Sequence, residues 1–203
     1  MACLGIDVSE NNGSNVNWQA IKDAGMKFAF VRSTYGKTGE DSMFLKNITE
    51  AQEQGLWTGA YHYSYALDVE NAIREAKHCR EFIEQSGVGF NILMFDMEDA
   101  DGYKANRGFD FSRENITAIC KAFIDNVGLV CGIYASEDWL KSYIDWESLG
   151  CPVWNAAWLS GDKIHAPQLY TNWDEIGGWF WQYTDSLNID GQIFDGNYCY
   201  SDL

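Results

Sequence analysis

The stretch Ile92-Leu93-Met94-Phe95-Asp96-Met97-Glu98 decides the fold that this sequence predicts. It is almost wholly apolar until it reaches its two carboxylates, which is the pattern of a parallel strand buried on both faces. Amphipathic helices are predicted on either side of it, over residues 68–86 and 112–128, with Asp68 and Ser112 as their N-caps. A buried strand between two such helices indicates a fold built from βα units.

The same alternation extends in both directions along the chain. Further strands are predicted at residues 3–7, 28–32, 57–65, 129–134 and 152–158, and further helices at residues 18–24, 43–54 and 137–144. Strands that alternate this regularly with helices indicate an α/β protein, either a βα barrel or an open sheet.

The C-terminal part of the sequence changes this rhythm. Residues 179–184 and 194–200 both have strand patterns, but only about nine residues lie between them. A parallel crossover needs roughly a dozen residues or more, so we predict an antiparallel hairpin with its turn near Ile189-Asp190-Gly191. We therefore expect a barrel that begins as βα units and closes with antiparallel strands.

Length and composition fit a single domain over residues 1–203 that can bury a sizeable core. No apolar run is long enough to span a membrane, so we expect no membrane insertion. The N-terminal residues lack the basic and apolar regions of a secretory signal. We expect that a signal has been removed or that the protein reaches its target by another route.

Charge and residue usage exclude several functions. The net charge is −16, and so acidic a surface is repelled by nucleic acids and by anionic membranes. The six cysteines include no C-x-x-C pair, and the three histidines are not spaced as metal ligands. We therefore expect no nucleic-acid partner, no metal and no cofactor, and thiols that are reduced core residues.

Polar and aromatic residues stand at the ends of the predicted strands. In βα barrels the functional side chains cluster at the C-terminal ends of the strands. The candidates at these positions are Asp7, Arg32, the segment Tyr61–Tyr65, Asp96, Glu98, Tyr134, Trp158, Gln182 and Asp195.

Asp96 and Glu98 form the strongest candidate pair. Residues two apart on a strand point to the same face, so the two carboxylates repel and the less solvated one has a raised pKa. Glycosidic bond cleavage requires such a separation of an acid from a charge stabiliser. The alternative is that either residue caps a loop or pairs with a Lys or Arg, because Asp-x-Glu alone is common. Asp7 and Asp195, although each could be a turn residue, support the functional reading by ending two further strands.

The remaining candidates each keep a structural alternative. Arg32 is either an ion-pair partner at the core edge or a charge that tunes the carboxylates. His62 is predicted to be a core histidine rather than an acid or base. Trp158 and Gln182 suit sugar stacking and hydrogen bonding, although Trp158 could equally serve packing.

Several motifs together resemble one known family. They are GIDVSENNGSNVNW (5–18), FAFVRSTYG (28–36), GAYHYSYA (59–66), FDMED (95–99), GIYAS (132–136), FWQYTD (180–185) and FDGNY (194–198). In this order they resemble the glycoside hydrolase family 25 lysozymes, the Chalaropsis-type muramidases. The resemblance runs from about Leu4 to Tyr198, which is essentially the whole chain.

The resemblance implies a fold and an activity. The fold would be a flattened, irregular TIM-like βα barrel, and the substrate would be the glycan strand of peptidoglycan. The reaction would be hydrolysis of the β-1,4 bond between N-acetylmuramic acid and N-acetylglucosamine. The protein would act on the bacterial cell wall, either as a secreted or excised catalytic domain or as a phage endolysin released by a holin.

The resemblance also assigns roles to residues. Glu98 would be the general acid, and Asp96 would stabilise positive charge, with Asp7 and Asp195 as the other catalytic carboxylates. Tyr61, Tyr63 and Tyr134, with Arg32, Trp158 and Gln182, would contact the substrate. Family members often have a more apolar residue where Gly196 follows Asp195 here, so the last motif departs from the family's usual form at this position. Attack by Asp96 and attack by the substrate's acetamido group both stay open.

Two other functions compete with this one. The first is a non-catalytic glycan-binding module on the same barrel, although a binder has no need for an acid beside a charge stabiliser. The second is a hydrolase of another polysaccharide, such as chitin. Comparing the products released from peptidoglycan and from chitin distinguishes a muramidase, a binding module without activity and a hydrolase of another polysaccharide.

Overall fold

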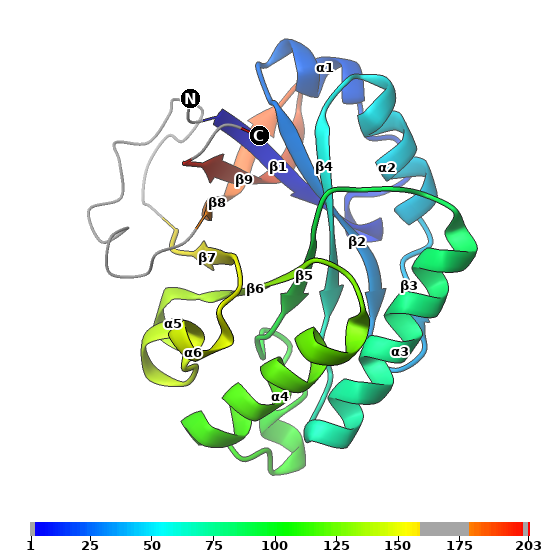
Figure 1. Ribbon diagram of the computed structural model, residues 1–203. Coiled ribbons are helices and arrows are strands. Elements are labelled where there is room, and N and C mark those ends of the chain that lie inside the picture. Colours follow the sequence, from blue (N-terminus) through cyan, green and yellow to red (C-terminus); the bar gives the residue numbers. More distant parts are fainter. Residues whose placement is uncertain (1–2, 159–178, 201–202) are drawn as a thin grey trace.

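The computed structural model describes residues 3–158, 179–200 and 203, and in them strands alternate with helices from the N-terminus onward (Figure 1). The strands are β1 (Cys3–Val8), β2 (Phe28–Tyr35), β3 (Gly39–Glu40), β4 (Trp57–Tyr63), β5 (Leu93–Asp96), β6 (Cys131–Ser136), β7 (Val153–Ala156), β8 (Phe180–Ile189) and β9 (Gln192–Cys199). The helices are α1 (Trp18–Asp23), α2 (Phe44–Glu53), α3 (Val69–Ser86), α4 (Arg113–Val127), α5 (Glu137–Ser142) and α6 (Trp146–Leu149), with 3₁₀ turns η1 (Glu10–Asn12) and η2 (Ala105–Arg107).

Eight of the strands close into a barrel. Neighbouring strands pair in the order β1-β9-β8-β7-β6-β5-β4-β2, and β1 pairs again with β2 to complete the ring. The barrel pairs among β1, β2 and β4 to β8 are all parallel, whereas β9 runs antiparallel to both of its neighbours. The short β3 adds only to the edge of β2. This confirms the predicted α/β barrel and its antiparallel closure.

The closing hairpin is longer than the sequence pattern predicts. Its pairing continues to Ile189 opposite Gln192, so only Asp190 and Gly191 form the turn. Both turn residues have positive φ, 52° for Asp190 and 82° for Gly191, as tight hairpin turns with right-handed strand twist require. The expected turn position is therefore right. The polar stretch between Asp185 and Asn188 hid the outer half of β8 because it lacks the apolar alternation of a strand.

Side-chain alternation separates the barrel interior from the helical layer. On β2, Phe28 and Phe30 point inward, whereas Ala29 and Val31 pack outward against the helices. The rings of Phe30 and Trp154 stack inside the barrel with centroids 4.4 Å apart. The rings of Phe28, Phe30, Trp154 and Phe180 fill the barrel interior and form an aromatic plug. A Cβ atom at Gly59 would collide with the Phe30 ring, so a glycine at this position leaves room for the plug.

The helices cover the outer face of the parallel strands (Figure 1). Asp68 caps α3 by accepting a hydrogen bond from the Asn71 backbone N–H, and Ser112 caps α4 in the same way through Asn115, as predicted. Gly87 and Gly128 end these helices in the left-handed conformation. The bounds of both helices therefore agree with the sequence pattern to within a residue.

The described part of the chain has no helix that is both long and apolar enough to cross a membrane. All six cysteines lie in this part, and no disulfide joins them. Cys79, Cys120, Cys131 and Cys199 are buried, as expected of core thiols.

Candidate active site

A cavity of about 720 Å³ opens where the parallel strands end. Nine of the ten predicted site residues line it: Asp7, Arg32, Tyr61, Tyr63, Asp96, Glu98, Tyr134, Gln182 and Asp195. The tenth, Trp158, lies beside this group, with 57% of its surface exposed. Side chains separated by up to 188 positions in the sequence, from Asp7 to Asp195, therefore meet at one end of the barrel.

The two-residue repeat of the strands places these side chains. On β2 the inward positions after Phe28 and Phe30 lead to Arg32, and on β5 the inward Met94 leads to Asp96. The inward residues are thus aromatic or apolar near the start of each strand and polar at its end. The aromatic plug forms the floor under the polar cavity.

Glu98 lies on the loop after β5 rather than on the strand. The strand ends at Asp96, whereas the apolar pattern predicts a strand over residues 92–97. The Met97 backbone N–H nevertheless donates to the Tyr134 carbonyl oxygen at 2.9 Å, and the Met97 side chain is buried. This strand-like contact keeps Asp96 and Glu98 on the same side, so both line the cavity as the i, i+2 spacing predicts.

The two carboxyl groups hold their protons more tightly than free carboxylates do. Burial and the charge of Glu98 raise the pKa of Asp96 well above its usual value. Burial, with further contributions from Asp195 and Asp101, raises the pKa of Glu98 to about 7 against the lowering effect of Lys104. A carboxyl group with a pKa near 7 can donate a proton at neutral pH.

Asp96 also has an unused acceptor. Its side chain is only 4% exposed, and its Oδ1 atom has no hydrogen-bond partner among the described residues. A buried acceptor without a partner is unfavourable by roughly 1–3 kcal/mol, so this oxygen is suited to receive a donor that enters the cavity.

A second carboxyl pair faces the first from the closing strands. Asp7 on β1 lies directly opposite Asp195 on β9, and the two carboxyl groups share a hydrogen bond. Burial and the charge of Asp195 raise the pKa of Asp7 well above its usual value, and burial raises the pKa of Asp195 to about 6. Burial thus disfavours the ionised form of both carboxyl groups, and the ionisation of one depends on that of the other.

Side-chain amides fix the position of Asp7. Its Oδ2 atom accepts hydrogen bonds from Gln182 Nε2 at 2.9 Å and from Asn197 Nδ2 at 2.7 Å. Gln182 Oε1 accepts in turn from Tyr134 Oη at 2.9 Å and from Trp158 Nε1 at 3.0 Å. Gln182 thus links three strand ends through one amide, which fixes the orientation of that amide.

Sequence reasoning missed Asn197 and Trp154. Trp154 Nε1 donates a hydrogen bond to Asn197 Oδ1 at 2.8 Å, and Asn197 Nδ2 in turn donates to Asp7 Oδ2. The signal for Asn197 was its position two residues after Asp195, on the same face of β9. Nothing in the sequence pointed to a functional role for Trp154, because a tryptophan inside a predicted strand is normally a core residue.

Replacing Trp154 with phenylalanine tests this network. The ring stays, but Asn197 Oδ1 loses its donor while buried, so we expect the free energy of unfolding to fall by about 1–3 kcal/mol. Urea unfolding measures this change. The matched control is Trp139→Phe, which alters a partly buried tryptophan packed at the edge of the core. Equal stability of Trp154→Phe and the wild type would contradict the assigned role of this hydrogen bond.

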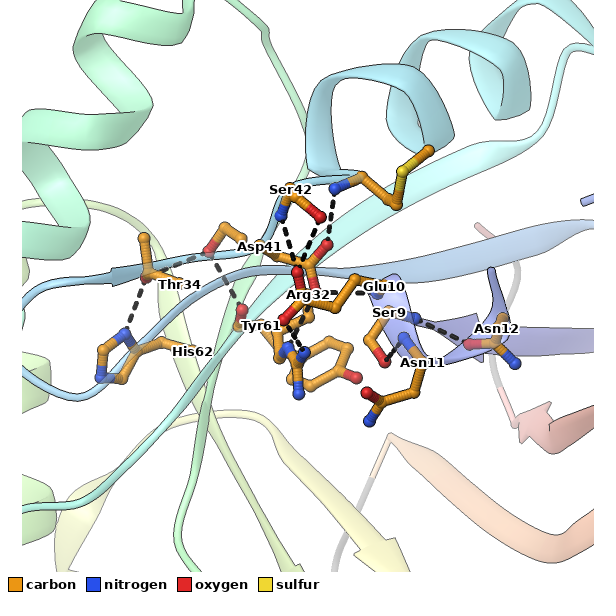
Figure 2. Close-up of polar contacts among 12 residues, drawn as sticks. Ser9, Glu10, Asn11, Asn12, Arg32, Thr34, Asp41, Ser42, Tyr61 and His62 are labelled. Carbon is orange, nitrogen blue, oxygen red and sulfur yellow. Dashed lines mark hydrogen bonds and ion pairs between the residues drawn. The ribbon is translucent and has the colours of Figure 1, made fainter. Parts of the chain in front are cut away.

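Arg32 is an ion-pair partner as well as a cavity residue. Its Nε atom lies 2.9 Å from Asp41 Oδ2, and its Nη2 atom lies 3.1 Å from Glu10 Oε1 (Figure 2). Glu10 also accepts from the backbone N–H and the hydroxyl of Ser42. Arg32 therefore ties the η1 turn to the segment before α2, and the sequence pattern identified neither Glu10 nor Asp41 as its partner.

Tyrosines extend the cavity wall beyond Glu98. Tyr63 packs edge-to-face against Tyr65, and Tyr65 packs against Tyr103 with centroids 4.6 Å apart. Tyr65 Oη donates to Asp101 Oδ2 at 3.0 Å. Flat aromatic surfaces with hydroxyl tips are typical of sites that bind sugar rings.

His62 belongs to the core, as predicted. It is fully buried beside the stacked rings of Phe95 and Phe123, and it contacts Thr34 Oγ1 at 2.8 Å (Figure 2) and Glu75 Oε2 at 3.3 Å. Burial lowers its pKa, but hydrogen bonds to Cys79 and Glu75 outweigh this effect and raise the pKa to about 9. His62 does not line the cavity.

A βα barrel with paired carboxyl groups of raised pKa and a tyrosine-lined cavity is the arrangement of a glycoside hydrolase. Comparison with known families identifies which one. The chain belongs to glycosyl hydrolases family 25, whose model matches residues 6–192. It is therefore a glycoside hydrolase, and its family is that of lysozymes and muramidases.

Three similar proteins illustrate the relationship. The N,O-diacetylmuramidase of Arthroderma benhamiae is 27% identical, over 95% of this chain and 82% of its own. The autolytic lysozyme of Clostridium acetobutylicum is 27% identical, over 92% of this chain and 52% of its own. The modular autolysin LytC of Streptococcus pneumoniae, solved in complex with a synthetic peptidoglycan ligand, has a TM-score of 0.79 at 22% identity and covers 98% of this chain. This chain spans 47% of LytC and about half of the clostridial lysozyme.

Proposed function

We propose that this protein is an N-acetylmuramidase that hydrolyses the β-1,4 bond between N-acetylmuramic acid and N-acetylglucosamine in bacterial peptidoglycan. The observation that carries the proposal is the pair Asp96 and Glu98 in one cavity, with a pKa of about 7 at Glu98. The names of the fungal and clostridial relatives, a muramidase and a lysozyme, support the choice of substrate. The site of action is accordingly the cell wall.

Glu98 is the general acid. Its carboxyl proton passes to the glycosidic oxygen while the bond between that oxygen and the anomeric carbon breaks. Burial favours the neutral form of Glu98, so the acid is available up to about pH 7. Hydrolytic rate should therefore fall as pH rises through this value.

Asp96 acts on the developing positive charge. Its buried Oδ1 atom, which has no partner among the described residues, is suited to accept a hydrogen bond from the N–H of the substrate's acetamido group. Such a contact would turn the acetamido oxygen toward the anomeric carbon. The positive charge of the ring that forms would favour the ionised form of Asp96, against the burial that favours its protonated form. Direct attack by Asp96 is the competing route.

The other cavity residues bind and orient the sugar. The tyrosines and Trp158 offer faces for stacking, and Gln182 and Arg32 hold the loops and carboxyl groups in place. Asp7 and Asp195 face the reacting pair and share a hydrogen bond, so negative charge on this second pair adds to the potential around the developing cation.

The bond that is cleaved tests the proposal. Purified peptidoglycan is digested, the new reducing ends are reduced with borohydride, and the products are identified by mass spectrometry. We expect reduced N-acetylmuramic acid at each new end and little release from chitin oligosaccharides. Ends in N-acetylglucosamine, or faster release from chitin, would overturn the bond assignment. Sedimentation with cell walls without any product would indicate a glycan-binding module instead.

A further inference from the structure

Lys104 is a buried lysine beside the proposed acid. Its side chain is 1% exposed, and it lies immediately before η2 on the segment that follows Glu98. A charged ammonium is strongly disfavoured in the interior unless acceptors and opposite charges surround it. The ammonium group of Lys104 therefore needs hydrogen-bond acceptors and opposite charges close to it.

The ammonium group bridges two strand ends. Lys104 Nζ donates to the Ser64 carbonyl oxygen at 2.5 Å and to the Glu98 carbonyl oxygen at 2.6 Å. Ser64 follows β4 and Glu98 follows β5, so one side chain joins the ends of neighbouring strands. The backbone N–H of Lys104 also donates to Asp99 Oδ1 at 2.6 Å, which closes the segment from Glu98 to Lys104 into a fixed loop.

The Ser64 anchor is itself held from α3. Glu75, which is fully buried, accepts from Ser64 Oγ at 2.8 Å and from the Tyr65 backbone N–H at 3.0 Å. Glu75 also contacts His62 Nε2 at 3.3 Å. A continuous line of buried polar contacts therefore runs from the helical layer through Ser64 and Lys104 to the backbone of Glu98.

Carboxyl groups face Lys104 from several elements. They are Glu75 on α3, Asp96 on β5, and Asp99 and Glu98 on the loop after β5. Lys104 Nζ lies 5.9 Å from the centroid of the Tyr63 ring on β4. The positive charge of Lys104 also acts on the Cys120 thiol of α4. Burial lowers the pKa of Lys104, and the four carboxyl groups oppose that effect.

Glu98 is surrounded mainly by groups that disfavour its ionised form. The ionisable groups near it are Asp96, Asp99, Asp101, Asp195, Tyr63, Tyr134 and Lys104. Among these, Lys104 is the cation. Its charge therefore opposes the effect of burial and keeps the pKa of Glu98 lower than burial alone would make it.

We propose that Lys104 is a positioning residue for Glu98, whose ammonium holds the Glu98 backbone in place and sets the pH above which hydrolysis declines. This inference rests on the proposed role of Glu98 as the acid. Lys104 touches no substrate atom in this scheme, because it is 1% exposed and its Nζ atom donates to two backbone oxygens. Its effect reaches the reaction only through Glu98.

The sign of the effect separates this role from simple structural damage. A general acid is active while protonated, so hydrolysis declines as pH rises through the pKa of Glu98. Removing the positive charge raises that pKa, and the alkaline limb of the pH profile should move upward by roughly 1 pH unit. Mere loosening of the fold would lower activity without moving the limb in that direction.

The experiment compares three variants of Lys104 in the whole chain. Lys104→Met removes charge and donors, Lys104→Gln keeps a donor without the charge, and Lys104→Arg keeps the charge. We expect kcat to fall roughly 10- to 100-fold in Lys104→Met with KM little changed. The alkaline limb should move upward in the Met and Gln variants and stay in place in the Arg variant. Lys121→Met is the matched control, because Lys121 is an exposed lysine on α4.

A titration independent of activity completes the test. The side-chain carboxyl carbon of Glu98 is followed by ¹³C NMR, assigned by its disappearance in Glu98→Gln. Its pKa should rise in Lys104→Met or Lys104→Gln, and the ¹⁵N signal of Lys104 in the wild type should be that of an ammonium throughout the active range. An unchanged Glu98 titration in a folded variant, or a neutral Lys104 amine in the wild type, would overturn the inference. Normal activity of Glu98→Gln would overturn the proposed function instead, while the titration still reports on Lys104.

Discussion

Replacing Glu98 with glutamine is expected to lower the rate of peptidoglycan hydrolysis by roughly 10³-fold or more, because general acid catalysis typically contributes about 10²–10⁴. Glutamine has nearly the same shape but no acidic proton, so the leaving oxygen departs without protonation. The release of reducing sugar from purified peptidoglycan measures the effect. Among the residues that the structure describes, none donates a hydrogen bond to the Glu98 side chain, so the variant should fold as the wild type does.

Glu84→Gln is the matched control for this variant. It makes the same chemical change at an exposed position on α3, outside the cavity. We expect its activity and its melting temperature to equal those of the wild type. Near-normal release of reducing sugar by Glu98→Gln would remove Glu98 from the role of the acid.

Replacing Asp96 with asparagine is expected to lower kcat by about 10²–10³-fold, the usual consequence of removing one preorganised electrostatic contact to the transition state. Asparagine can still accept a hydrogen bond through its side-chain oxygen, but it cannot carry a negative charge. KM should therefore change much less than kcat. Steady-state kinetics on a soluble peptidoglycan fragment separates the two parameters.

Two further observations distinguish the possible roles of Asp96. If Asp96 orients the acetamido group, a thiazoline analogue of the cyclised sugar should inhibit the wild type strongly and Asp96→Asn weakly. If Asp96 attacks the anomeric carbon, rapid acid quenching should leave a glycosyl adduct on the peptide that contains Asp96. We expect inhibition and no adduct. Detection of the adduct would contradict the proposed role of the acetamido group.

The buried His62–Glu75 pair sets a boundary on the pH range in which such experiments are interpretable. The folded-state pKa of His62, about 9, lies above its unfolded value near 6.5. Its contribution to stability is therefore complete below about pH 6.5 and is lost as pH rises through 9. Rates measured between about pH 6.5 and 9 are therefore compared with the free energy of unfolding at the same pH, which separates the chemistry of the site from the loss of this pair.

The local pattern of the sequence determined the parallel part of the barrel. Burial on both faces of the strand that ends at Asp96, and the caps at Asp68 and Ser112, are visible in short stretches of chain, since strand and helix periods are local properties. The same reasoning placed the candidate carboxyl groups, because in parallel strands the C-terminal ends meet at one end of the barrel. Seven of the nine predicted side chains that line the cavity follow from this rule. Gln182 and Asp195 do not, because Gln182 lies near the start of β8 and Asp195, which was predicted to end a strand, lies inside the antiparallel β9.

Only the tertiary structure decided which partner each of these side chains has. The Asn197 contact to Asp7, the Trp154 contact behind it and the Arg32 ion pairs join residues from different elements, and no periodicity encodes such pairs. The outer half of the closing hairpin was likewise hidden, because its pairing compensates for a polar sequence.

The segment of residues 92–98 shows what local sequence and what tertiary structure contribute. Its apolar residues determined a buried strand, and its spacing put Asp96 and Glu98 on one side. The acidity of Glu98 depends on burial and on Lys104, which reaches back from six residues later to bridge Glu98 to Ser64. Local sequence therefore determined where the carboxyl groups lie, whereas their protonation was decided by charges that only folding brings together, because electrostatic effects depend on distance in space.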